Sequence, residues 1–308
     1  MEKNKVLGNI IIEESEIYLL KTIETGYDTI ELQNFKGEDV DGDQMAEYFS
    51  RLEGIEKVKT LHISYNSDLK DLRIIKGFPN LTNVFIYGYK IKTLDGLEYL
   101  TNGSYLYIDT GKNHSRSIAN IAQAPIEELT LVYARKDDYE AISASKTIKY
   151  IELGYCPHPP FDKWTDLPLE HLKFSLGKFS ELGDLALLKQ LRTMDIISCR
   201  KLERFVGDNS GVTWMLIDSC KKLDLSTIKT FHSIESLIIN TNPNEVPLSA
   251  FGGLEKLKHL KFIRCKVNVD IMNLREVMPN LEKLFIDNLG KEKKLELSRL
   301  NPGLSFQY

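Results

Sequence analysis

Residues 79–100 read PNLTNVFIYGYKIKTLDGLEYL. Within this stretch Leu81, Val84 and Ile86 follow the spacing L-x-x-L-x-L, where L stands for any apolar residue. Side chains two positions apart in a β-strand point to the same side, and those between them point to the other side. The stretch therefore predicts a strand with one buried and one outward face, followed by an apolar return segment over residues 91–100.

The same spacing recurs along most of the chain. Copies begin at positions 58, 81, 126, 148, 169, 191, 212, 234, 257 and 281, with a weaker copy at Gly103 and an earlier one at Tyr27. From position 58 onward the copies start 21 to 24 residues apart. A single strand of this kind cannot bury its apolar face alone, whereas stacked copies build one continuous core. The repeat therefore predicts a solenoid with about twelve parallel strands, one for each copy.

This pattern resembles the leucine-rich-repeat family, whose period is about 20–29 residues, and most closely its short internalin-like bacterial class. Pro79-Asn80-Leu81 and Pro279-Asn280-Leu281 repeat the same strand entry. The resemblance implies an α/β solenoid: a horseshoe with a parallel concave β-sheet and short helical or irregular segments on the convex side. It also implies a protein-binding module, although the family shares a mode of binding and not a ligand.

The two ends depart from the repeat. Residues 1–57 are predicted to form an N-terminal cap with the first strand and a helix, residues 58–294 the array, and residues 295–308 a C-terminal cap, all in one continuous domain. The predicted helix lies in the segment 43–55 (DQMAEYFSRLEGI), with Asp43 as its N-cap and apolar residues near helical spacing. Solenoids need such caps because their terminal coils would otherwise expose the core.

All four cysteines occupy the ninth position of their copy, and they are Cys156, Cys199, Cys220 and Cys265. At this position a small side chain is expected to turn inward and satisfy backbone groups of the next coil. The cysteines are therefore predicted to be buried and reduced, which suits a cytoplasmic protein. They include no C-x-x-C pair of the kind that binds zinc.

The sequence contains no recognisable catalytic or metal-binding constellation. The outward-facing histidines His62, His171 and His259 are four or five strands apart and cannot share a metal ion. Asp39-x-Asp41-x-Asp43 begins like a calcium loop, but the glycine and glutamate that the EF-hand requires further on are missing, so a helix cap is favoured. We therefore predict a protein without enzymatic activity, metal or cofactor.

Charge and hydropathy limit the partners. The formal net charge of −4 disfavours nucleic-acid binding, which needs a surplus of Lys and Arg on one face. No run approaches the ~18 apolar residues of a membrane span, and the N-terminus lacks the features of a secretory signal. The expectation is a cytoplasmic protein that is a monomer when free and binds another protein.

The outward positions of the predicted strands, which are the third, fifth and seventh of each copy, combine aromatic and acidic residues. Aromatic side chains dominate binding hot spots, and carboxylates favour a partner with a basic surface. Together with the resemblance, this suggests an immunity protein that neutralises a toxin. The candidate partner-binding residues are Phe85, Tyr87, Tyr105, Tyr107, Asp109, Glu128, Tyr133, Tyr150, Glu152, Tyr155, Asp195, Trp214 and Asp218.

Three alternatives stay open. The aromatic residues could serve only to stabilise the sheet, because they are good strand formers. The chain could be an intracellular scaffold or adaptor that docks through its Pro-rich segment 157–168, predicted to bulge from the convex side. The aromatic face could instead bind carbohydrate by stacking on sugar rings.

Overall fold

The computed structural model describes residues 5–6, 9–13, 20–24, 26–35, 41–112 and 116–306. Asp39, the first residue of the rejected calcium loop, lies outside this part of the chain. The chain divides into two compact units, Met1–Ile151 and Glu152–Tyr308, here called the first and second unit. Each is described by itself.

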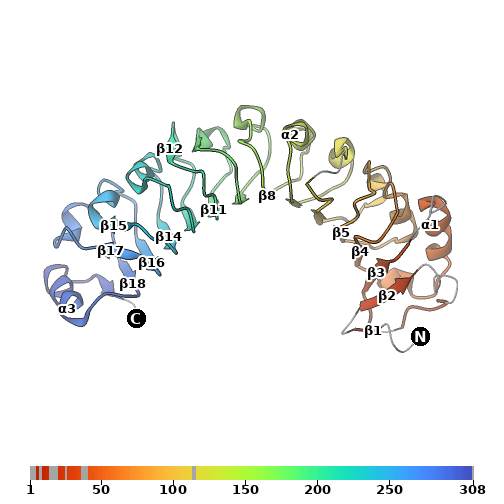
Figure 1. Ribbon diagram of the computed structural model, residues 1–308, viewed down its shortest axis with the longest axis horizontal. Coiled ribbons are helices and arrows are strands. Elements are labelled where there is room, and N and C mark those ends of the chain that lie inside the picture. The colour runs from red at the N-terminus through yellow and green to blue at the C-terminus, as the bar shows by residue number, and fades with distance from the viewer. Residues whose placement is uncertain are drawn as a thin grey trace. The chain divides into compact units, whose positions relative to one another are not determined.

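The first unit is built on strands that lie side by side in chain order (Figure 1). All are parallel except β1, which is antiparallel to β2. The strands between residues 9 and 108 alternate buried apolar residues with outward ones, as the period-two pattern requires. The strands are β1 (Lys5–Val6), β2 (Asn9–Glu13), β3 (Thr29–Gln33), β4 (Thr60–Ile63), β5 (Asn83–Ile86), β6 (Tyr105–Ile108), β7 (Glu128–Leu131) and β8 (Tyr150–Gly154), which runs across the division.

The return segments of the first unit form short helices on one side of the strands and leave the other side bare (Figure 1). Their buried apolar residues close the core from the outside. The helices are α1 (Gly42–Ser50) and α2 (Lys136–Ser143), and the 3-10 turns are η3 (Ile55–Lys57), η4 (Arg73–Gly77), η5 (Leu97–Tyr99) and η6 (Ala119–Gln123).

Helix α1 confirms the predicted helix but corrects its start. Its N-cap is Asp41, whose side chain accepts a hydrogen bond from the backbone N–H of Asp43 at 2.8 Å. The prediction that Asp43 is the N-cap was wrong by two residues, because both Asp41 and Asp43 satisfy the sequence rule for an N-cap. The helix buries Met45 and Phe49, and Gly54 with a φ of +83° precedes η3. That residues 1–57 cap the core stays a prediction.

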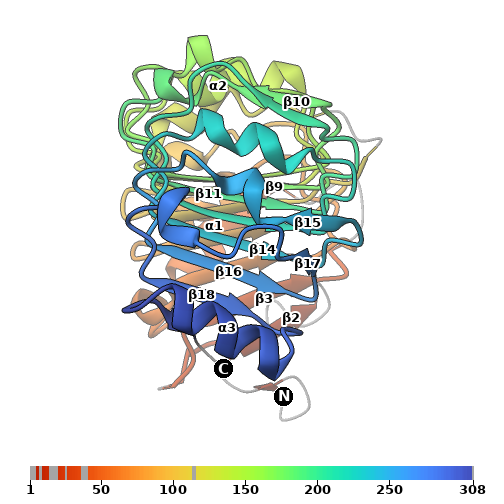
Figure 2. The ribbon, with the colours of Figure 1, turned by 90° about the vertical axis from the view of Figure 1, so that its left-hand side faces the viewer.

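The second unit continues the same plan (Figure 2). Its parallel main strands are the end of β8, β9 (His171–Ser175), β11 (Thr193–Ile197), β13 (Trp214–Asp218), β14 (Ser236–Asn240), β16 (His259–Ile263), β18 (Lys283–Ile286) and β19 (Ser305–Phe306). Two further parallel pairs join β10 (Glu181–Gly183) to β12 (Arg204–Val206) and β15 (Glu245–Pro247) to β17 (Lys266–Asn268). Its helical segments are η7 (Phe161–Lys163), η8 (Leu185–Leu187), η9 (Leu225–Thr230), η10 (Leu248–Phe251), η11 (Leu274–Glu276) and α3 (Lys291–Leu300).

Every copy of the sequence spacing forms a main strand at the predicted register, so the predicted solenoid is confirmed. Strands β1, β2 and β19 of the main sheet were missed, as were the two further pairs, β10 with β12 and β15 with β17. The core of β2 is Ile10-Ile11-Ile12, an uninterrupted apolar run without the polar alternation that marked the other copies.

A left-handed backbone conformation recurs directly after the strands. The eighth residue of a copy has a φ between +49° and +60° at Asn34, Tyr133, Tyr155, Leu176, Ser198, Ser219, Thr241 and Arg264. Such a conformation is unfavourable for residues other than glycine. A hydrogen bond from the same backbone N–H to the next coil compensates it: Leu176 donates to the Ile197 carbonyl at 2.9 Å, and Ser198 to the Asp218 carbonyl at 2.8 Å.

The cysteines follow this left-handed residue, and all four are free and buried, as predicted. The backbone N–H of Gly177 donates to the Sγ of Cys199 at 3.3 Å, and the thiol of Cys220 contacts the Ile196 carbonyl. These backbone groups belong to the preceding coil, so the prediction that cysteines serve the next coil was wrong. A hydrogen bond with Cys199, together with burial, raises the pKa of Cys220 well above the ordinary thiol value.

The Pro-rich segment 157–168 does not bulge outward, which corrects the prediction. Its apolar side chains Phe161, Trp164 and Leu167 are all buried, and Trp164 has no exposed surface. The rings of Phe161 and Trp164 meet edge to face with centroids 5.9 Å apart. The segment is therefore an ordinary return segment that fills the core of the second unit.

Candidate functional site

Seven ring side chains gather on the outward face of three neighbouring strands of the first unit. They come from β4, β5 and β6 and from the residues just after β4 and β5. We call them the ring cluster: His62, Tyr65, Phe85, Tyr87, Tyr89, Tyr105 and Tyr107.

Strand register brings the central rings together. His62, Phe85 and Tyr107 occupy equivalent positions of adjacent strands. The rings of His62 and Phe85 stack with centroids 4.4 Å apart, and those of Phe85 and Tyr107 are 5.9 Å apart. Directly opposed aromatic residues on one sheet face are within contact distance. The centre of the cluster is therefore preorganised, and its half-buried rings have little freedom to lose on binding.

The edge of the cluster is more open. The ring of Tyr65 lies 5.3 Å from that of Tyr87 and 5.0 Å from that of Tyr89, and the Tyr65 hydroxyl donates to an Asp109 carboxylate oxygen at 3.4 Å. Tyr65 is 43% exposed and Tyr89 40%, high values for large aromatic side chains. This edge offers apolar surface to solvent, and a partner would gain by covering it.

The outward face of the first unit is acidic. Its third, fifth and seventh positions carry the carboxylates of Glu13, Glu31, Asp109 and Glu128, and within the described strands these positions hold no Lys or Arg. Burial and the nearby Asp109 carboxylate raise the pKa of Tyr107 above its usual value and that of Tyr65 to about 12. Burial also lowers the pKa of His62, so its ring is neutral at pH 7.

The raised pKa of Tyr65 predicts an alkaline loss of stability. The folded state holds this proton more tightly than the unfolded chain, so the contribution is complete below pH ~10 and is lost as the pH rises from ~10 towards about 12. We expect Tyr65→Phe, which cannot ionise, to gain stability relative to wild type over this range. Urea unfolding at several pH values measures it. Tyr99→Phe, which removes the hydroxyl of an equally exposed tyrosine in η5, is the control.

Of the predicted binding residues, the structure brings Phe85, Tyr87, Tyr105, Tyr107 and Asp109 together in or beside the ring cluster. The first unit also contains Glu128 in β7, Tyr133 just after it and Tyr150 in β8. The sequence interpretation missed Tyr65, Tyr89 and the role of His62. Tyr65 occupies the same eighth position as Tyr133 and Tyr155, so the signal was present in the repeat.

The predicted acidic residues of the second unit are engaged within it. Glu152 forms an ion pair with Lys173 at 3.0 Å and accepts a hydrogen bond from Ser175. Asp195 lies 3.1 Å from the Nε2 of His171. Asp218 accepts hydrogen bonds from Asn240 and Ser219. These carboxylates are less available to a basic partner than the sequence suggested.

The last two predicted residues of the second unit are aromatic. Trp214 begins β13 and is partly exposed on the outward face. Tyr155 follows β8 in the left-handed conformation and is also partly exposed.

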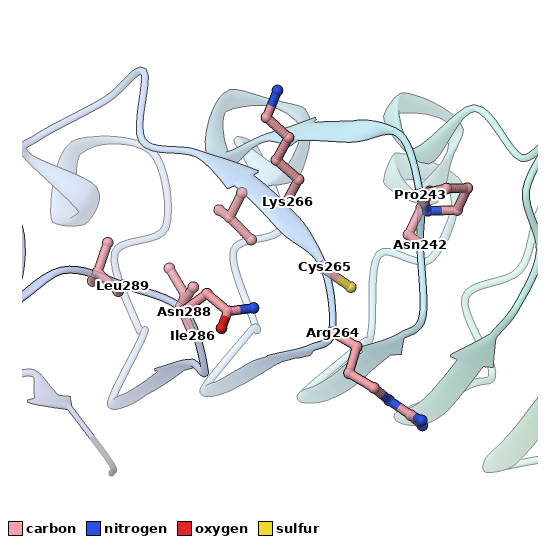
Figure 3. Close-up of a pocket in the computed structure, with 9 residues that line it drawn as sticks. Asn242, Pro243, Arg264, Cys265, Lys266, Ile286, Asn288 and Leu289 are labelled. Carbon is pink, nitrogen blue, oxygen red and sulfur yellow. The ribbon is translucent and has the colours of Figure 1, made fainter.

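A separate pocket of about 500 Å³ lies beside β16 and β17 in the second unit (Figure 3). The Arg264 and Lys266 side chains point in opposite directions from it, and each has a partner: Arg264 donates to Asn240, and Lys266 lies 3.8 Å from Glu245. Within the described residues, no group of three or more His, Cys, Asp and Glu is placed to hold a metal ion. The residues that line the pocket include no Asp, Glu or His.

None of the described helices is long and apolar enough to cross a lipid bilayer.

No family model matches the chain, and no curated protein does. Among solved structures it is similar to an internalin (InlF) from Listeria monocytogenes, with 17% identity, a TM-score of 0.48, and coverage of 89% of this chain and 75% of that one. It is also similar to TLR13 in its complex with ssRNA13, with 12% identity, a TM-score of 0.52 and coverage of 86% of this chain. The chain spans about half (47%) of the TLR13 chain. The fold is a leucine-rich-repeat solenoid.

Proposed function

We propose that this protein is a non-enzymatic binding module that recognises a basic protein through the ring cluster. The observation that carries the proposal is the gathering of seven contacting rings on an outward face whose charged positions, within the described strands of the first unit, are carboxylates. Tyrosines supply large contact area at low entropic cost, and carboxylates steer a basic partner towards them.

Sheet stabilisation alone accounts for only part of the cluster. The stacked pair His62 and Phe85 supports β4 and β5 in the way that cross-strand pairs do. Tyr65 and Tyr89, however, follow their strands and leave about two-fifths of their surface in solvent. They add exposed aromatic area without pairing any strand positions, which favours a binding role.

The finer proposal is that binding neutralises the partner, as an immunity protein neutralises a toxin, with this chain acting as a cytoplasmic monomer. A solenoid offers a large surface for binding, and a partner whose basic functional surface is covered by it can no longer use that surface. A nucleic acid is the less favoured ligand. TLR13 forms a complex with ssRNA13, but in this chain the carboxylates around the rings would repel phosphates.

The test uses the partner captured from the source cell's lysate, purified and titrated calorimetrically. We expect Tyr87→Ala/Tyr107→Ala to weaken binding by at least ~30-fold, because hot-spot residues contribute ~2 kcal/mol or more. The control is Tyr99→Ala, an exposed tyrosine of the same unit that lies in η5. Equal affinities for all three proteins would refute the ring cluster as the binding surface.

Two other outcomes would identify the alternatives. Binding to a glycan array that is lost with the Tyr87→Ala/Tyr107→Ala variant would favour a carbohydrate-binding surface. A partner that is retained by this variant and lost on changing exposed residues of 157–168 would favour a scaffold. The burial of Phe161 and Trp164 leaves that segment little apolar surface for docking.

A further inference from the structure

The second unit has a charged surface of its own at the end of the sheet. A pocket of about 200 Å³ opens on the outward face of β14, β16 and β18, which lie next to one another (Figure 2). We call it the cationic pocket, and its outward side chains are Ser236, Ile238, His259, Lys261, Lys283 and Phe285.

Register explains how the pocket forms. Ile238, Lys261 and Phe285 occupy equivalent positions on the three strands, and Lys283 stands beside His259 in the neighbouring row. The Nζ of Lys261 lies 5.0 Å from the centroid of the Phe285 ring. A cation–π contact of this kind holds the ammonium group in place without neutralising it.

The two lysines of the pocket differ from their neighbours in having no carboxylate partner among residues 152–306. Nearby Lys258 pairs with Glu235 at 2.8 Å, and Lys266 lies 3.8 Å from Glu245. The carboxylate that follows β18, Asp287, accepts a hydrogen bond from the backbone N–H of Arg264. The charges of Lys261 and Lys283 are therefore not offset by an ion pair within this unit.

We propose that the cationic pocket binds an acidic segment of a partner protein, with a Glu or Asp carboxylate between Lys261 and Lys283 and the adjoining apolar atoms on Ile238 and Phe285. The small volume suits one side chain and the charge suits a carboxylate. A nucleic acid would need a longer track of cations, and Asp195 and Asp218 lie on the same outward face of this unit. This proposal does not depend on the ring cluster.

The experiment measures fluorescence anisotropy with the full chain. The probe is a short fluorescein-labelled peptide in which glutamate alternates with serine, and the reference is the same peptide with glutamine. We expect binding of the glutamate peptide only, weaker at higher salt. Lys261→Ala/Lys283→Ala should weaken it at least ~tenfold. Lys221→Ala/Lys229→Ala removes the same charge from sites outside the pocket and should leave it unchanged.

Three results would overturn the proposal: equal binding of the glutamine peptide, equal loss in both double-lysine variants, or tighter binding of a single-stranded oligonucleotide of the same formal charge. Phe285→Leu provides a second check, because it keeps an apolar contact and removes the cation–π interaction, so a partial loss is expected. The Tyr87→Ala/Tyr107→Ala variant should bind the peptide like wild type. The peptide experiment therefore tests the cationic pocket separately from the proposal that the ring cluster binds a basic protein.

Discussion

Asp138→Asn is expected to lower the free energy of unfolding of the first unit by about 3–5 kcal/mol, the usual effect of removing one partner of a buried ion pair. Asp138 lies in the first turn of α2, and its carboxylate is 3.2 Å from the guanidinium of Arg116. The side chains are 3% and 1% exposed. Burial lowers the pKa of Arg116, and the Asp138 charge opposes this shift. Without that charge, the guanidinium is buried without compensation.

The same carboxylate also accepts a hydrogen bond from the backbone N–H of Arg135 at 2.8 Å, which helps to begin α2. Asparagine keeps the shape and part of the hydrogen bonding, so the loss reports mainly the charge. Urea unfolding measures it, and Asp137→Asn, an exposed neighbour in the same turn, should change stability little. Adding Arg116→Met to Asp138→Asn should restore part of the loss. Equal stability of the Asp138 and Asp137 variants would contradict the argument.

Trp164→Ala should destabilise the second unit by about 3–5 kcal/mol, as is typical when a large buried aromatic side chain is removed from a core. Trp164 has no exposed surface, and its ring packs against Phe161. The change removes apolar burial and leaves a cavity that the surrounding coil cannot fully close. Thermal or urea unfolding with a probe of the second unit would record the loss.

Lys163→Ala, one residue away and exposed at the end of η7, is the matched control and should change stability by less than ~0.5 kcal/mol. If Trp164→Ala were as stable as this control, the segment 157–168 would not be part of the core. The sequence interpretation of that segment as a projecting loop would then be restored.

That interpretation failed for a physical reason. Four prolines in residues 156–168 indicate irregular backbone. Apart from the short turn η7, the segment forms neither helix nor strand, so this indication was correct. The prolines do not indicate whether that backbone lies on the core or projects from it, because this depends on whether Phe161 and Trp164 find an apolar surface to cover. The interval between copies, 21 residues from position 148 to 169, was the better guide: it left no room for an insertion.

The candidate surface was predictable in its centre and not at its edge. Phe85, Tyr87, Tyr105 and Tyr107 were assigned from alternation alone, since each lies on the outward side of the repeat's strand pattern. Tyr65 and Tyr89 were missed because they follow their strands, where the period-two alternation ends and the path of the loop directs the side chains. The sequence also did not show which carboxylates are available to a partner. Glu152 and Asp195 lie at outward positions like Asp109, but Glu152 is paired with Lys173 and Asp195 lies against His171.

The sequence by itself determined the repeat, the strands and the face on which each strand residue lies. These depend on local periodicity and on the need of each coil to bury the same apolar positions. Only the tertiary structure decided that Tyr65 meets Asp109, 44 residues away, that Arg116 is neutralised by Asp138, and that Lys261 lies against the Phe285 ring. These contacts depend on rotamers and turn geometry between separate coils, which periodicity does not specify.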